Sequence, residues 1–151
     1  MAQIAKDKTK LYFIAIIPPS PIYDYAQSQK NYFRDQYQSK ASLNSPPHIT
    51  LHMPFSWKEK KEQELVDALA EFAMKFTPFA IELKNFSCFS PKVIFIDVNK
   101  NEDLAGLQQH LHKFCKRELN IFNADYKEQP FYPHVTLAFR DLKKPIFAKA
   151  W

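Results

Sequence analysis

Apolar residues along the chain follow two spacings, one typical of strands and one typical of helices. A continuous apolar run from Leu11 to Ile17 ends at two prolines, which is typical of a strand buried on both faces. Further strands are predicted at residues 48–53 and 134–139. Strict alternation at 79–84 predicts a half-exposed strand, with residues 93–98 as its antiparallel partner after a turn around Ser90-Pro91.

Helical spacing of apolar residues fills the segments between these strands. It predicts a helix from Pro21 to about Ser39 and another from about Glu102 to Asn120. Ser56 and Glu59 form a capping box, so a helix with one buried face is expected behind them, reaching Phe76. A last helix is expected to open at Pro145. Helices interleaved with strands that include an antiparallel pair predict an α+β protein.

Length and composition narrow the class of protein. The chain has 151 residues, which fits one domain or two small lobes sharing a core, and we take residues 1–151 as a single two-lobed domain. Gly106 is the only glycine, so phosphate-binding loops built on glycines are excluded. The net charge of +5 is compatible with an anionic partner such as RNA or a nucleotide phosphate.

The cysteines and the apolar segments of the chain indicate the cellular compartment to expect. Cys88 and Cys115 form neither a disulfide framework nor a metal motif, which favours a reducing, cytoplasmic setting. The apolar run that ends at Ile17 is short and is followed by prolines rather than a cleavage site, so a buried strand explains it better than a signal peptide. No stretch has the length of a membrane span, and we expect a monomer that does not contact membranes.

A short internal repeat stands out from the rest of the chain. Residues Pro47-His48-Ile49-Thr50-Leu51 match Pro133-His134-Val135-Thr136-Leu137, which lie 86 residues later, at four identical positions and one conservative one. In a strand, the histidine and threonine of each copy share one face, while the other apolar residues face a core. If the two strands are equivalent elements of two similar lobes, the two pairs face each other across a cleft, related by a pseudo-twofold axis.

This pairing suits phosphodiester chemistry without a metal or cofactor. One neutral imidazole, of His48 or His134, can take a proton from water or a ribose hydroxyl, while the other delivers a proton to the leaving oxygen. The hydroxyls of Thr50 and Thr136 can donate hydrogen bonds to the non-bridging phosphate oxygens. Which histidine is the acid and which is the base stays open at this point.

Paired His-x-Thr motifs on strands, with helices between them, resemble the two-histidine phosphoesterase superfamily, including the bacterial 2′-5′ RNA ligase-like (LigT-like) cyclic phosphodiesterases. The resemblance implies two pseudo-symmetric lobes of antiparallel sheet with helices outside and a central cleft. It implies activity on 2′,3′-cyclic phosphates of RNA or nucleotides, on 2′-5′ linkages or on small cyclic phosphates. Carried over by motif, His48 and His134 would be the acid-base pair, and Thr50 and Thr136 would bind the phosphate.

Two features depart from the family pattern. RNA-processing members commonly carry an arginine five residues after the second histidine, where this chain has Phe139 and then Arg140. Simple alternation would still put Arg140 on the face of His134, so we expect it to contact a phosphate. The second motif is followed by only about 14 residues, so we expect either that the second lobe is short at the C-terminus or that the chain is part of a longer protein. Alternatives to hydrolysis are a non-catalytic nucleotide- or RNA-binding module and RNA 2′-5′ end-joining.

Other polar and aromatic residues have simpler interpretations. His52 is expected to line the site or pack beside it, and His110, His112 and Cys115 are expected to be surface and core residues of a helix rather than metal ligands. Aromatic residues flank both motifs and could stack a base or ribose, although packing is the commoner role for each: Phe55, Trp57, Phe131 and Tyr132. Tyr132, next to the second motif, is the one we take as substrate-binding.

Overall fold

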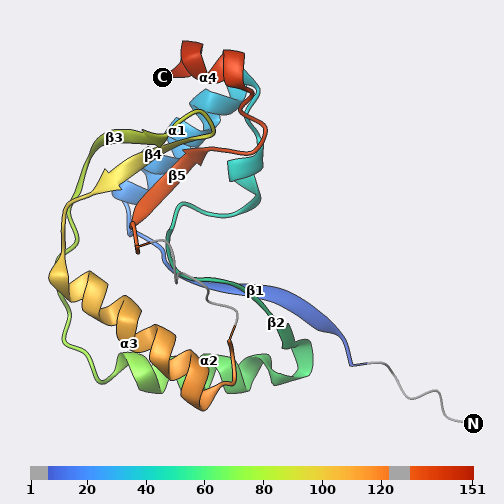
Figure 1. Ribbon diagram of the computed structural model, residues 1–151, viewed down its shortest axis with the longest axis vertical. Helices are drawn as coiled ribbons and strands as arrows, with labels where there is room; N and C mark the ends of the chain where they lie inside the picture. The colour runs from blue at the N-terminus through green and yellow to red at the C-terminus, as the bar shows by residue number, and fades with distance from the viewer. Residues whose placement is uncertain (1–6, 123–129) are drawn as a thin grey trace, which may run out of the picture. The chain divides into compact units, whose positions relative to one another are not determined.

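The computed structural model describes residues 7–122 and 130–151 (Figure 1). Strands and helices interleave along the chain, as the hydrophobic pattern predicts. In order, the elements are β1 (Thr9–Ile16), α1 (Ile22–Tyr37), the 3₁₀ turn η1 (Ala41–Asn44), β2 (Ile49–Lys58), the 3₁₀ turn η2 (Glu59–Lys61), α2 (Glu62–Ala73), β3 (Leu83–Phe89), β4 (Val93–Val98), α3 (Glu102–Glu118), β5 (His134–Ala138) and α4 (Lys144–Ala150).

The strands of the described residues form a five-stranded sheet in the order β1-β2-β5-β4-β3. The pairs β2–β5, β5–β4 and β4–β3 are antiparallel, which agrees with the α+β class expected from the sequence. The chain divides into two compact units, and β1 and β2 each pass from one unit into the other. Unit 1 comprises residues 1–14, 51–80 and 102–131, and unit 2 comprises residues 15–50, 81–101 and 132–151.

Unit 2 is built around β3, β4 and β5, with α1 packed against β5 (Figure 1). Three apolar residues form a row across its strands, because Val135 of β5 is paired with Ile49 on one side and Ile96 on the other. All three are buried, and α1 contributes the buried ring of Phe33. Fully burying an aliphatic side chain of this size stabilises a fold by about 1.5–3 kcal/mol, so this row anchors the register of the strands.

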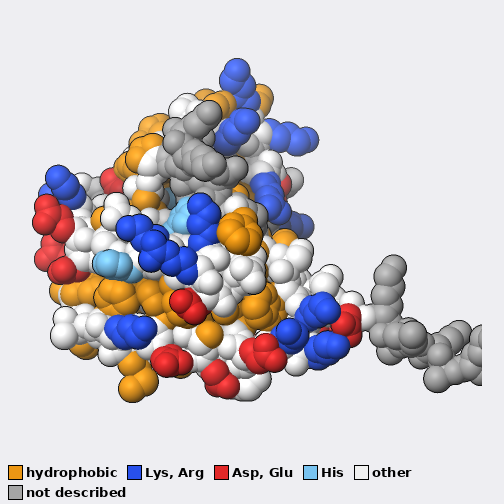
Figure 2. Space-filling model, turned by 60° about the horizontal axis from the view of Figure 1, so that its bottom comes forward, with side chains coloured by type: hydrophobic (Ala, Val, Ile, Leu, Met, Phe, Trp, Pro, Cys, Tyr) orange, Lys and Arg blue, Asp and Glu red, His pale blue; other side chains and the backbone are white. Residues whose placement is uncertain are grey.

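Unit 1 contains α2, α3 and most of β1 and β2. Helices α2 and α3 lie side by side, with the rings of Phe72 and Phe114 centred 4.9 Å apart (Figure 1). Near the start of β1, acidic and basic side chains pair on the surface, including Asp7 with Lys58 and Lys60 at 2.9 and 2.7 Å. Figure 2 shows Lys and Arg side chains close to Asp and Glu side chains on the face in view. Exposed pairs of this kind contribute little to stability.

Two predictions from local pattern are wrong in position. The Ser56–Glu59 capping box does not begin a helix, because β2 continues to Lys58 and α2 begins at Glu62 after a 3₁₀ turn. The side chains of residues 79–84 do alternate between half-buried and exposed, as predicted. However, the strand pairs with β4 only from Leu83 onward. In both places the extent of the strand follows its hydrogen-bonding partner rather than its own residues. Among the helices that the structure describes, none combines the length and apolarity needed to cross a membrane.

Candidate active site

The two Pro-His-x-Thr-Leu segments lie at the starts of two neighbouring antiparallel strands, β2 and β5. His48 directly precedes β2, His134 is the first residue of β5, and the histidine and threonine of both segments belong to unit 2. The middle residues of the two segments, Ile49 and Val135, are paired across the strands and are 3% and 0% exposed. Because alternate residues of a strand point to opposite faces, the histidine and threonine of each motif lie on the face away from this apolar pair. Both motifs therefore bring their polar side chains to the same face of the sheet.

The register also fixes which polar residues are neighbours. Continuing it by one residue in each direction sets His48 opposite Thr136 and Thr50 opposite His134. The two histidines are then diagonal neighbours, a relation in which residues of adjacent strands lie about 7–8 Å apart. An antiparallel pair has a local twofold axis, which relates the two motifs as neighbouring strands of one sheet. All four side chains are half-buried.

Each imidazole is held by the backbone of its own motif. Nδ1 of His48 lies 2.6 Å from the carbonyl oxygen of Pro46, and Nδ1 of His134 lies 2.7 Å from that of Tyr132, in both cases two residues upstream. A carbonyl oxygen can only accept, so Nδ1 carries the proton and donates it in each ring. Nε2 of the neutral ring is then left with a lone pair, and the two histidines present the same tautomer.

Burial favours the neutral form of both rings. Desolvation lowers the pKa of His48 and of His134 below the ordinary histidine value, and the hydrogen bond to a carbonyl offsets part of that effect in each. The charges of Lys30 and of a protonated His134 lower the pKa of His48 further. Asp97 acts in the opposite direction on His134 and raises its pKa. The two rings are therefore alike in tautomer, and within the described part of the chain a carboxylate acts on His134 and an ammonium acts on His48.

The loop that leads into His48 is held by a buried lysine of α1. Lys30 is 1% exposed, and its Nζ donates hydrogen bonds to the carbonyl oxygens of Ser42 and Ser45 at 2.7 and 2.9 Å. Desolvation lowers its pKa from 10.5 to about 8, so the amine is mostly charged at neutral pH. This side chain ties helix α1 to the turn η1 and to the segment that precedes the first motif.

A carboxylate that follows the second motif holds the same turn from its other end. Asp141 accepts hydrogen bonds from the Ser39 hydroxyl at 2.8 Å and from the backbone N–H groups of Lys40 and Ala41 at 2.7 and 3.0 Å. Desolvation alone would raise the pKa of Asp141, but these bonds together hold it below the ordinary value. The segment after β5 thus positions the loop before β2, which links the two motifs through η1.

Aromatic side chains cluster around His134. The ring centroids of Phe95 and Phe89 lie 4.8 and 5.2 Å from its imidazole, and that of Tyr132 lies 6.4 Å away. Phe95 is fully buried, whereas Phe89 and Tyr132 are 40% and 45% exposed. The cluster desolvates the imidazole on one side and leaves two ring surfaces open to solvent beside it.

Asp97 is a site residue that sequence reasoning missed. It is paired with His134 across β4 and β5, so both side chains lie on the same face. Its Oδ2 accepts a hydrogen bond from the Tyr132 hydroxyl at 3.3 Å, and its Oδ1 accepts one from the Val98 N–H at 2.9 Å. A single acidic residue within the apolar strand 93–98 was the available signal. Without the strand register, it could not be assigned to either motif.

Arg140 does not follow the alternation that predicted its direction. Strand β5 ends at Ala138, and Arg140 has a positive φ of 60°, so the chain has left extended geometry there. Its guanidinium lies over the ring of Phe139 at 5.0 Å from the centroid. Sharing a face with His134 is therefore not supported by strand geometry, and any phosphate contact of Arg140 stays a prediction.

The remaining histidines lie in unit 1. His52 is 1% exposed, its Nδ1 donates to the Met53 carbonyl oxygen at 2.8 Å, and its ring packs edge-on against Phe55 at 5.4 Å. It is thus a packed residue of β2. Within residues 7–122 and 130–151, no three histidine, cysteine, aspartate or glutamate side chains gather as metal ligands. His112 and Cys115 do not belong to such a group.

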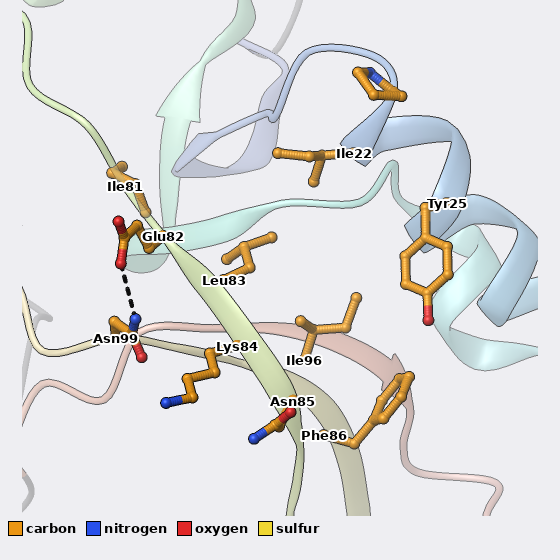
Figure 3. Close-up of a pocket in the computed structure, with 11 residues that line it drawn as sticks. Ile22, Tyr25, Ile81, Glu82, Leu83, Lys84, Asn85, Phe86, Ile96 and Asn99 are labelled. Carbon is orange, nitrogen blue, oxygen red and sulfur yellow. Dashed lines mark hydrogen bonds between the residues drawn. The ribbon is translucent and has the colours of Figure 1, made fainter.

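A cavity of about 730 Å³ lies on the other face of the sheet in unit 2 (Figure 3). Ile22 and Tyr25 of α1 line it together with Phe86 and Ile96 of β3 and β4. Ile96 is on the face opposite to its strand neighbours Phe95 and Asp97, which face His134. The cavity is therefore separated from the two histidines by the thickness of the sheet.

Comparison with known proteins agrees with this geometry. A family model described as the 2′-5′ RNA ligase superfamily matches residues 18–151. Proteins of a Geobacillus species and of Geobacillus kaustophilus are each 34% identical over 142 residues, which is 93% of this chain and 75% of each relative. A protein of Bacillus pumilus is 32% identical over 129 residues, covering 84% of this chain and 68% of its own. All three bear the name "Putative phosphoesterase". The chain belongs to the 2′-5′ RNA ligase superfamily, whose members are two-histidine phosphoesterases.

Proposed function

We propose that this protein is a phosphoesterase that hydrolyses a 2′,3′-cyclic phosphate or phosphodiester of RNA or a nucleotide, without a metal. His48 and His134 form the general acid-base pair, and Thr50 and Thr136 bind the phosphate. The observation that carries the proposal is the matched tautomer of the two histidines, because each Nδ1 donates to a backbone carbonyl and the lone pair of each neutral ring is therefore on Nε2.

The spacing of the histidines supports a single phosphate between them. Diagonal neighbours on adjacent strands have Cα atoms about 7–8 Å apart. Two imidazoles that extend from the same face at this spacing can each form a hydrogen bond of about 2.8 Å to a different oxygen of one phosphate. The threonines occupy the other two corners of the same four-residue group, so their hydroxyls can donate to the non-bridging oxygens. Such donors stabilise the charge that develops when phosphorus becomes five-coordinate.

The hydrolysis step uses both protonation states of imidazole. One histidine is neutral and takes a proton from water at Nε2 while the water oxygen forms a bond to phosphorus. The bond between phosphorus and a ribose oxygen breaks, and the other histidine gives its Nε2 proton to that oxygen. A cyclic phosphate is thereby opened to a phosphomonoester and a hydroxyl. The low pKa of both rings makes the neutral base available near pH 7.

Exposed aromatic rings support a nucleotide rather than a small sugar phosphate. Phe89 and Tyr132 leave ring surface open beside His134, and single-stranded nucleic acids are commonly held by stacking of bases on such rings. The net charge of +5 favours an anionic substrate of the same kind.

The test is hydrolysis of a panel of 2′,3′-cyclic nucleotides and RNA oligomers with a 3′-terminal cyclic phosphate, measured in EDTA. We expect turnover by the wild-type protein and a loss on the order of a hundredfold or more in His48→Ala and in His134→Ala. His110→Ala is the matched control, because this exposed histidine lies on α3 of unit 1 and is expected to leave the rate unchanged.

Other outcomes of the same panel would contradict the proposal. Activity that survives both histidine replacements would exclude them as the acid-base pair, and activity that EDTA abolishes would exclude a metal-free mechanism. Tight nucleotide binding without turnover would identify a binding module. Ligation of ends bearing a 2′,3′-cyclic phosphate and a 5′-hydroxyl, without net hydrolysis, would identify end-joining, which is the same chemistry with a ribose hydroxyl in place of water.

A further inference from the structure

Among residues 7–122 and 130–151, different charged groups act on the two histidines. His134 is opposed across the strand pair by Asp97, while the charged group that acts on His48 from α1 is the ammonium of Lys30. The rings also face each other, so a proton on one disfavours a proton on the other. In the part of the chain that the structure describes, the aromatic neighbours of His134 are Tyr132, Phe89 of β3 and Phe95 of β4.

The position of Asp97 is fixed rather than that of a free surface side chain. It is half-buried, and each carboxylate oxygen accepts one hydrogen bond, from the Val98 N–H and from the Tyr132 hydroxyl. Opposed residues in an antiparallel pair have Cβ atoms about 4.5–5.5 Å apart. At that range, and with part of the solvent excluded by Phe95, a carboxylate stabilises an imidazolium by electrostatics without bonding to Nδ1.

We propose that Asp97 is a positioning residue that keeps the catalytic proton on His134, so that His134 is the general acid and His48 is the general base. This assignment rests on the proposed function of the same site. In the reaction, Nε2 of His48 takes the proton of the attacking water, and Nε2 of His134 gives its proton to the ribose oxygen as the bond from that oxygen to phosphorus breaks. Exchange with solvent then returns the proton from His48 and restores it on His134.

The position of the proton can be tested without substrate. The five histidines are followed by NMR as a function of pH, with His48→Ala and His134→Ala used to assign the two resonances. We expect His134 to titrate at a higher pH than His48, and Asp97→Asn to lower the titration midpoint of His134 while that of His48 moves less. Asparagine keeps an oxygen for Tyr132 and has nearly the same shape. An unchanged midpoint for His134, or a His48 that titrates above it, would overturn the proposal.

The roles of the two rings are tested with a pair of matched substrates. One is a nucleoside 2′,3′-cyclic phosphate, and the other carries sulfur in place of the bridging oxygen at the bond that the wild-type protein breaks. A thiolate leaves without needing a proton, so replacement of a general acid harms only the oxygen substrate. We expect His134→Ala to lose at least a hundredfold on oxygen and little on sulfur, and His48→Ala to lose on both.

Asp97→Asn separates an electrostatic role from a structural one. We expect a loss of about tenfold on the oxygen substrate, little loss on the sulfur substrate, and recovery of most of the rate in Asp97→Glu. Equal losses on both substrates would make Asp97 merely structural, and a His48→Ala protein that is rescued by sulfur would reverse the roles. If the wild-type protein turns over neither substrate, the proposed function fails, while the NMR titration still decides whether Asp97 holds the proton on His134.

Discussion

Replacing Lys30 with methionine is expected to remove a pH dependence of stability that the buried ammonium imposes on unit 2. The side chain is 1% exposed, and the folded state lowers its pKa from 10.5 to about 8 through desolvation. In the unfolded chain the amine is hydrated and has its ordinary pKa of 10.5. Methionine has a similar length and an apolar stem, but it carries no group that titrates.

The sign and the size follow from the two pKa values. Between pH 8 and pH 10.5 the unfolded chain still binds a proton that the folded protein has released, so the free energy of unfolding rises with pH. The cost of holding the charge is fully present below pH 8 and is gone above pH 10.5. The difference between the folded and unfolded pKa values of Lys30 corresponds to about 3 kcal/mol in the free energy of unfolding. This is a large fraction of the stability of a domain of this length.

The assay is urea unfolding at several pH values from 7 to 10.5, followed by the fluorescence of the two tryptophans, on the wild type and on Lys30→Met. The difference between the two free energies of unfolding is expected to rise by about 3 kcal/mol over that range. Titration of other groups cancels in this difference. Lys113→Met, at an exposed lysine of α3, is the control that should leave it flat. A constant difference between wild type and Lys30→Met would refute the reasoning.

Three further predictions concern the site and the turn that supports it. Thr136→Val should lower kcat for the cyclic substrate by about 10²–10³-fold with little effect on the melting temperature, and a normal kcat would contradict its role toward the phosphate. Because the folded pKa of both His48 and His134 lies below the unfolded value near 6.5, the free energy of unfolding should fall as pH drops through 6.5 toward the folded values. A variant with both rings replaced by glutamine should lose that part of the acid dependence in denaturation experiments. Asp141→Asn should cost about 1 kcal/mol in thermal unfolding, since the carboxylate bonds are largely exposed, and should also reduce the rate. An unchanged rate would contradict the idea that η1 positions the catalytic residues.

Much of the architecture could be predicted because it depends on local pattern. The strand at 134–138 and the helices α1 and α3 follow from spacing that repeats every two or about four residues, and the structure confirms them within a few residues. The repeated motif supplied the candidate histidines, because strand alternation needs no partner to place a histidine and its threonine on one face.

The features that could not be predicted depend on register between strands. Asp97 and Phe89 come close to His134 through the pairing of β3, β4 and β5, which no local pattern encodes. From the sequence, Lys30 is expected to be an ordinary polar residue of an amphipathic helix. It is buried in the structure, where it contacts the segment that contains η1 through hydrogen bonds to Ser42 and Ser45. The Ser56–Glu59 capping box failed for a related reason, since the pairing of β2 extended the strand through it.

The central claim is that His48 and His134 bind one phosphate between them. It is tested most directly by a crystal structure of the protein with a nucleoside 2′-monophosphate or 3′-monophosphate, the products of opening a cyclic phosphate. We predict that Nε2 of each histidine lies about 2.7–3.0 Å from a different oxygen of the same phosphate, with Thr50 and Thr136 donating to the others. A well-occupied nucleotide held elsewhere, such as in the cavity beside Ile96, or imidazoles too far apart for one phosphate to bridge, would contradict the account.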